Sequence, residues 1–298
     1  MADILKTVLL GIVEGITEWL PISSTGHMIL LDEFIHLNAG DAFKNLFFVV
    51  IQLGAILAVI VLFWHRIWPF HLKKTKVKPF FTEKDGKPVT GIQAFCNDWI
   101  YMDRIILWLK IALACVPAAI LGTLFDDEID EMLTGDLRAY IVAAALIVYG
   151  VLFILIERKE HKISVDSVDD ISFKMAFFIG LIQCLALIPG TSRSGSTILG
   201  AVLLGTSRLA AAEFSFFLSI PAMVGGSGIN LLIFFADQNT VTAHEWFILL
   251  FGILVAFIVS IFAIKFLVSY IKKHDFKAFG YYRIVLGIIV LLYFALTV

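Results

Sequence analysis

The chain has 298 residues, of which 60% are hydrophobic and only 16% are charged. Soluble domains carry about a quarter charged residues, so this composition and the mean hydropathy of +0.93 predict a polytopic membrane protein. The net charge of −2 argues against nucleic acid as a partner, and the three cysteines lack the CxxC or Cys/His spacing of a metal site.

Six apolar segments are long enough, or nearly so, to cross a bilayer core, which takes about 20 helical residues. They cover roughly residues 46–66, 104–125, 138–156, 209–235, 246–271 and 281–298. Residues 4–36 and 173–206 differ, because each joins two short apolar runs through a break rich in Pro, Gly, Ser and Thr, at 21–26 and 189–195. Such short runs predict re-entrant helix-loop-helix hairpins. Irregular backbone survives at membrane depth only where it is buried in protein or lines a wet cavity.

The two breaks belong to a repeated stretch. Residues 11–30 and 180–199 align without a gap, at an offset of 169 residues, and they are identical at Gly11/Gly180, Ser23/Ser192, Gly26/Gly195, Ile29/Ile198 and Leu30/Leu199. Each half, about 1–160 and 170–298, then holds one hairpin and three spans. Because three is odd, the second half must enter the membrane upside down. We therefore expect an all-α polytopic membrane protein, a single integral membrane domain over 1–298 built from two inverted-topology repeats, with both breaks near the midplane.

The loops between the spans alternate in charge. Loops 66–104, 157–174 and 272–283 are rich in Lys and Arg, whereas 126–137 is acidic and 236–245 has neither Lys nor Arg. The positive-inside rule places the basic loops in the cytoplasm and both termini outside. The N-terminal run is interrupted by Glu14 and Glu18 and lacks a small-residue cleavage site, so we expect it to be retained rather than removed as a signal peptide.

Two carboxylates stand in the first hairpin. Glu14 and Glu18 are four residues apart, so a helix would place them on one face, where they repel each other. Three partners would relieve that repulsion: a divalent metal, Arg193 or a shared proton. An amphipathic helix that shows its acids to water is the structural alternative.

A run of hydroxyls and a histidine follows, Ser23-Ser24-Thr25-Gly26-His27. One hydroxyl at a helix start is expected to be an N-cap. His27 follows a glycine-bearing turn beside these hydroxyls, which favours a general base or proton donor over an interfacial histidine.

The second break, residues 189–197, has the composition of an anion site. Backbone N–H groups at a helix start bind phosphate, and glycines let it approach closely. Arg193 adds donors that match phosphate oxygens. An arginine at the bilayer centre costs about 2.5–3.5 kcal/mol, so it needs a bound anion or a carboxylate partner. A bridge to Glu14 or Glu18 alone is the alternative. Nucleotide binding is disfavoured because Ser196 stands where a P-loop has lysine.

Two motifs carry a resemblance to a known family. E-G-x-T-E-x-L-P-x-S-S-T-G-H at residues 14–27 and P-G-x-S-R-S-G-[AS]-T at 189–197 resemble the bacterial undecaprenyl-diphosphate phosphatases, the bacitracin-resistance membrane phosphatases. The similarity runs nearly end to end and includes residues 51–59 and 213–221. The stretch around 72–100 is longer and more basic than is typical of the family.

The resemblance implies hydrolysis of undecaprenyl diphosphate to the monophosphate in the bacterial inner membrane, which recycles the lipid carrier for cell-wall synthesis. It implies a divalent cation, Mg²⁺ or Ca²⁺, and a site open to the periplasm. The chemistry of the residues and the family resemblance together lead us to expect the catalytic residues to be Glu14, Glu18, Ser24, His27 and Arg193. We expect phosphate to contact Ser23, Thr25, Gly26, Gly190, Ser192, Ser194, Gly195 and Thr197, and the metal to bind Glu14 and Glu18.

Two other classes of membrane protein share features with this sequence. Type 2 phosphatidic-acid phosphatases place a histidine nucleophile six residues after the arginine, but that position is Leu199 here. A transporter or flippase of the lipid carrier is the non-enzyme alternative, because inverted repeats are common in transporters. The sequence leaves open attack by Ser24 or by water, the identity of the metal, and the oligomeric state, with a homodimer among the options.

Overall fold

The computed structural model describes residues 2–71, 79–82, 89–125, 128–129, 131–132, 135, 137–158 and 162–297. Its first half contains α1 (Ala2–Thr17), α2 (Ser24–Asp32), α3 (Asp41–Val50), α4 (Gln52–Leu62), α5 (Trp64–Ile67), α6 (Gly91–Trp99), α7 (Met102–Leu124) and α9 (Arg138–Glu157). Its second half contains the short turns η1 (Val168–Asp170) and η2 (Cys184–Leu187) and the helices α10 (Phe173–Gln183), α11 (Arg193–Leu203), α12 (Arg208–Ala236), α13 (Ala243–Ile271) and α14 (Lys277–Thr297).

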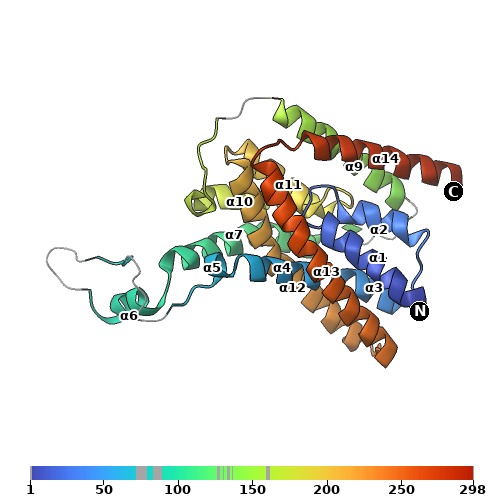
Figure 1. The fold of residues 1–298 in the computed structure, drawn as a ribbon, viewed down its shortest axis with the longest axis horizontal. Helices are drawn as coiled ribbons and strands as arrows, with labels where there is room; N and C mark the ends of the chain where they lie inside the picture. The colour runs from blue at the N-terminus through green and yellow to red at the C-terminus, as the bar shows by residue number, and fades with distance from the viewer. Residues whose placement is uncertain are drawn as a thin grey trace.

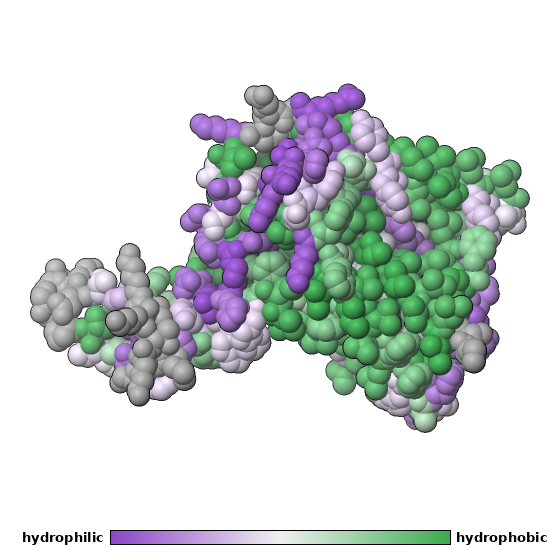
Figure 2. Space-filling view, viewed as in Figure 1, coloured by the Kyte–Doolittle hydropathy of each residue, from purple (hydrophilic) through white to green (hydrophobic). Residues whose placement is uncertain are grey.

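Six helical segments of the described chain are long and apolar enough to cross a membrane. They are residues 41–62, which comprise α3 and α4, and the single helices α7, α9, α12, α13 and α14. The six predicted spans are therefore confirmed, with small shifts at their ends. The face seen in Figure 2 is a broad hydrophobic surface bordered by hydrophilic residues, as a lipid-facing surface requires. The protein is an all-helical multi-pass membrane protein.

The helices that carry the two polar breaks pack in corresponding ways. α1 lies against α13, and α10 lies against α7, while α9 and α14 run side by side (Figure 1). Gly11 and Gly180, the first identity of the sequence repeat, stand at the two crossings. A Cβ on Gly11 would lie 2.9 Å from the Val255 side chain, and one on Gly180 would lie 2.1 Å from the Ala114 carbonyl oxygen. Glycine is needed at both positions because the helices approach so closely.

Both hairpin breaks lie slightly earlier in the chain than the sequence predicts. α1 ends at Thr17 and α2 begins at Ser24, so helix already includes part of the predicted break at 21–26. In the second half, η2 ends at Leu187 and α11 begins at Arg193. Each break is thus a few residues of irregular backbone between two short helices.

Several residues used to predict orientation lie outside the described part of the chain: Lys73, Lys74, Lys76, Lys78, Lys84, Lys87, Asp126, Asp127, Asp130, Asp136 and Lys159. One assignment from the loops is wrong. Arg283 was placed in the basic loop 272–283, but α14 begins at Lys277, and the Arg283 side chain is fully buried. Loop composition misleads here because this arginine is satisfied by buried carbonyl oxygens rather than by water.

Candidate functional site

A cavity of about 250 Å³ lies where the two hairpin breaks meet. Its walls contain six predicted site residues, Glu18, Ser24, Thr25, Gly190, Ser192 and Arg193, together with Gln52, Ala186, Ala222, Met223 and Gly226. The structure thus brings together polar groups from both copies of the repeat. η2, α4 and α12 supply the rest of the lining.

The two breaks end in the same serine cap. Ser23 and Ser192, which the repeat offset relates, have φ values of 73° and 72°. The hydroxyl of Ser23 accepts a hydrogen bond from the Gly26 N–H at 3.3 Å, and that of Ser192 accepts one from the Gly195 N–H at 3.1 Å. Positive φ is strained for a residue with a side chain, and such strain gathers at functional sites. Each serine is therefore an N-cap held in a costly conformation.

These caps make two helix starts converge on one cavity. Ser24 is the first residue of α2, and Arg193, its equivalent in the repeat, is the first residue of α11. The unpaired N–H groups and the positive end of the dipole at a helix start favour an anion. The cavity is consequently suited to a phosphate group approached from two sides.

The Glu18 carboxylate joins the two breaks. Arg193 donates to Glu18 Oε1 at 2.8 Å, and the Ser24 hydroxyl donates to Oε2 at 3.2 Å. The Ser194 hydroxyl also donates to the Glu18 carbonyl oxygen at 3.1 Å. Next to Glu18, the buried Trp19 ring packs edge-on against Phe216 with centroids 5.3 Å apart. One carboxylate thus contacts a hydroxyl and a guanidinium, and a buried aromatic anchors its position.

Glu14 lies one turn earlier on α1 and is buried. The Glu18 N–H donates to the Glu14 carbonyl oxygen at 3.1 Å, which confirms the helical spacing of the pair. Within the described chain, the Glu14 carboxylate makes no hydrogen bond or ion pair, although it lies within electrostatic range of Glu18 and Arg193. Two carboxylates lie near one guanidinium, and a shared proton or a cation would relieve the repulsion between them. Such a pair suits a hard divalent cation that takes its other ligands from phosphate and water.

His27 lies outside the cavity wall. Its Nδ1 is 2.7 Å from the Ser23 carbonyl oxygen, and its Nε2 is 2.7 Å from the Tyr282 hydroxyl, whose ring stacks on the imidazole. Since a carbonyl oxygen only accepts, Nδ1 carries the proton and, in the neutral ring, Nε2 accepts from Tyr282. The basic nitrogen of His27 is therefore directed at Tyr282 and not at Ser24.

The other predicted residues support the loops from behind. The Thr197 hydroxyl is 2.6 Å from the Ser215 hydroxyl and donates to the Arg193 carbonyl oxygen at 2.9 Å. Gly26 packs against Leu146, since a Cβ there would lie 2.9 Å from that side chain. These residues stay predicted phosphate ligands, but here they shape the loops.

Sequence reasoning missed Tyr282, Ser215 and Arg283. Arg193 also donates to the Ser215 carbonyl oxygen at 3.1 Å, so α12 fixes the guanidinium from the side opposite Glu18. Ser215 lies in the family-like stretch 213–221, but nothing there marks this serine as part of the site, and Tyr282 stands in an apolar helix without a motif. For Arg283, the only available signal was the presence of an arginine inside the predicted span 281–298.

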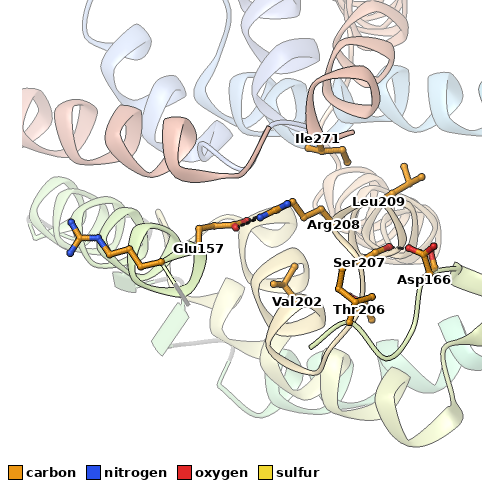
Figure 3. Close-up of a pocket in the computed structure, with 10 residues that line it drawn as sticks. Glu157, Asp166, Val202, Thr206, Ser207, Arg208, Leu209 and Ile271 are labelled. Carbon is orange, nitrogen blue, oxygen red and sulfur yellow. Dashed lines mark hydrogen bonds and ion pairs between the residues drawn. The ribbon is translucent and has the colours of Figure 1, made fainter. Parts of the chain in front are cut away.

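A second cavity, of about 560 Å³, lies among the ends of α9, α11, α12 and α13 (Figure 3). There Arg208 pairs with Glu157 through two hydrogen bonds, at 2.9 Å from Nε and 2.5 Å from Nη2. The Ser207 hydroxyl donates to the Asp166 carbonyl oxygen at 3.0 Å. No predicted site residue lines this cavity. The predicted site residues that line a cavity all lie around the 250 Å³ cavity between the hairpin breaks.

Known proteins resemble the chain over almost its whole length. Residues 7–289 match the family described as bacitracin resistance protein BacA. An undecaprenyl-diphosphatase of Enterococcus faecalis is 54% identical over 97% of this chain and 96% of its own. An undecaprenyl-diphosphatase of Acetivibrio thermocellus is 52% identical, and undecaprenyl-diphosphatase 1 of Clostridioides difficile is 51% identical, each over 99% of this chain and 98% of its own.

Proposed function

Because the chain belongs to the bacitracin resistance protein BacA family, we propose that it hydrolyses undecaprenyl diphosphate to undecaprenyl phosphate and inorganic phosphate. The names of its relatives support this substrate. The structural observation that supports this function best is the position of Glu18. Its carboxylate contacts both Ser24 and Arg193 where two helix starts meet. Such turnover would return the lipid carrier to cell-wall synthesis and confer bacitracin resistance.

The geometry supports Ser24 as the nucleophile. In this proposal Ser24 Oγ bonds to the terminal phosphorus and its proton passes to Glu18 Oε2. The bond from phosphorus to the bridging oxygen breaks, and undecaprenyl phosphate leaves with that oxygen. Water then attacks the phosphoserine, Glu18 mediates the proton transfers, and phosphate leaves as the hydroxyl is restored. The Ser24–Glu18 hydrogen bond is the nucleophile–base contact this route requires. Direct attack by water is the competing route.

Charge stabilisation falls to Arg193 and to the starts of α2 and α11. Arg193 and the N–H groups that open α2 and α11 would hold the phosphate oxygens as charge develops on them. The wall formed by Ala222, Met223 and Gly226 of α12 would contact the first part of the lipid. In this arrangement Ser24 and Glu18 handle the proton, and Arg193 with the backbone N–H groups binds the charged phosphate oxygens.

A divalent cation, Mg²⁺ or Ca²⁺, is part of the proposal, with Glu14 and Glu18 as its protein ligands. It would supply positive charge to the diphosphate oxygens. The position of the buried Glu14 carboxylate, one turn from Glu18 and without a hydrogen bond or ion pair in the described chain, supports this assignment. Direct proton transfer by His27 stays a prediction, and its bond to the Ser23 carbonyl oxygen supports a role in holding the turn before Ser24.

We also propose that the halves are inverted repeats with re-entrant hairpins. The matched caps at Ser23 and Ser192 and the matched crossings at Gly11 and Gly180 support the repeat. With basic loops in the cytoplasm, both termini lie outside. That the site opens to the periplasmic side is proposed from the resemblance to the family alone. Labelling of an introduced cysteine near Lys76 from outside intact cells would overturn this orientation.

The test of function is phosphate release from undecaprenyl diphosphate by purified protein, with and without a chelator. We expect release that stops on chelation and returns with Mg²⁺ or Ca²⁺. Acid quenching during turnover should trap phosphate on Ser24, and its absence there would favour direct attack by water. A protein that moves the lipid between leaflets but releases no phosphate would be a transporter instead.

A further inference from the structure

Arg283 is a buried arginine that joins the two hairpin loops. Its Nη1 donates to the Pro21 carbonyl oxygen at 3.2 Å, in the first break. Its Nη2 donates to the carbonyl oxygens of Gly190 and Thr191 at 2.8 and 2.9 Å, in the second break. The side chain is 0% exposed. One guanidinium from α14 therefore holds the backbones of both loops.

The surroundings are shaped to admit this guanidinium. A Cβ on Gly195 would lie 3.0 Å from Arg283 Nη1, so the glycine leaves it room. The Tyr149 ring of α9 lies 5.2 Å from Arg283 Cζ, within the range of a cation–π contact. Gly190 has φ +91°, and a Cβ there would lie 2.8 Å from Val142 Cα. The second loop can thus turn its carbonyl toward Arg283 only because it has glycine at this point.

No carboxylate of the described chain forms an ion pair with Arg283, and its Nε has no hydrogen-bond partner there. Burying such a charge is expensive, and it is tolerated where strong acceptors surround it. Its partners are carbonyl oxygens that the irregular breaks would otherwise leave unpaired. The guanidinium of Arg283 thus provides hydrogen-bond donors to these carbonyl oxygens, and they provide acceptors for its buried N–H groups.

We propose that Arg283 is a positioning residue that locks the two loops together and so sets the distance between Ser24 and Arg193. Pro21 lies between Glu18 and Ser24, and Thr191 lies two residues before Arg193. A shift of either loop would therefore separate the proposed nucleophile from the proposed phosphate-binding arginine. This inference rests on the proposed function for its effect on catalysis, but the locking itself is independent of the reaction.

The test compares Arg283→Gln and Arg283→Lys with the wild type, using kinetics and hydrogen exchange. Because misplacing reacting groups by about 1 Å costs about 100-fold, we expect Arg283→Gln to lower kcat about 100-fold with KM within about threefold. Lysine keeps the charge but lacks the planar fork that reaches several carbonyls, so we expect a loss of about tenfold. Arg208→Lys, at the second cavity, is the matched control and should keep kcat.

Hydrogen exchange without substrate separates the locking from the reaction. In Arg283→Gln, peptides over residues 18–27 and 187–197 should lose protection together while the spans keep theirs. Loss in one loop only, unchanged protection in both, or equal loss in all spans would overturn the proposal, as would wild-type kcat in Arg283→Lys. If the wild type released no phosphate, the proposed function would fail while the exchange result would still decide on the locking.

Discussion

The two polar breaks end in the same serine cap but differ in chemistry. Ser23 and Ser192 have φ values within a degree of each other and make the same cap. At the next position the first break has Ser24 and the second has Arg193, and Glu18 corresponds to the apolar Leu187. Two similar caps thus open two helix starts that favour an anion. The first start lies beside a carboxylate and a hydroxyl, and the second carries a cation.

This difference shows why neither break is sufficient alone. Glu18 obtains its counter-charge from Arg193 of the other loop at 2.8 Å, and that arginine is steadied by α12. Opposite charges that would be costly in the membrane singly are tolerated because the loops face each other. Four sets of substitutions test this difference between the loops.

The largest effect is expected at the second loop. Arg193→Ala should lower kcat by roughly 10³-fold or more, because arginines that stabilise phosphoryl transfer contribute about 10³–10⁵-fold. It also leaves the Glu18 carboxylate without its ion pair. Phosphate release measures the effect, and size-exclusion chromatography checks that the protein stays folded. Activity within tenfold of the wild type would show that the Arg193 side chain is not needed to stabilise the transferred phosphate.

At the equivalent position of the first loop, Ser24→Ala should lower kcat by roughly 10²–10³-fold, since some turnover by water remains near the Arg193 site. Its stability should change little, because Ser24 donates a single hydrogen bond. Burst kinetics and acid quenching follow the loss of phosphoserine. A Ser24→Ala protein with wild-type kcat would show that the hydroxyl is not the nucleophile.

Intermediate effects are expected where the hairpins cross the neighbouring helices. Gly180→Ala should lower the Tm more than Gly11→Ala, because the new Cβ meets the backbone oxygen of Ala114 at 2.1 Å rather than the Val255 side chain at 2.9 Å. Overpacking of this kind costs about 1–3 kcal/mol. Thermal unfolding in one detergent compares the two. The reverse order would mean that the crossings are not equivalent.

The smallest effects are expected at the caps. Ser23→Ala and Ser192→Ala should each reduce stability by about 1 kcal/mol, the usual cost of a lost N-cap. Both keep a side chain at positive φ, so the two losses should agree within about 0.5 kcal/mol. Thermal unfolding of both variants measures them. A clear difference between the two losses of stability would show that the serine cap does not stabilise the two loops equally.

The spans and the breaks could be predicted from the sequence because bilayer thickness and proline–glycine punctuation act locally. The pairing of Arg193 with a carboxylate was foreseen, as one of several options, from the cost of a buried charge. The partners of His27 were not foreseen, since Tyr282 is 255 residues away along the chain. Arg283 was misplaced for a related reason: its acceptors are backbone oxygens, which leave no trace in side-chain patterns.

The central claim, that the two loops form one catalytic unit, is tested most directly by a double-mutant cycle on Glu18 and Arg193. Phosphate release is measured for Glu18→Gln, Arg193→Gln and the double variant. Residues that act as a unit are strongly non-additive. We predict that the double variant is about as slow as the slower single variant. If the two losses multiplied, Glu18 and Arg193 would act independently, and the account of a site divided between two facing repeats would be contradicted.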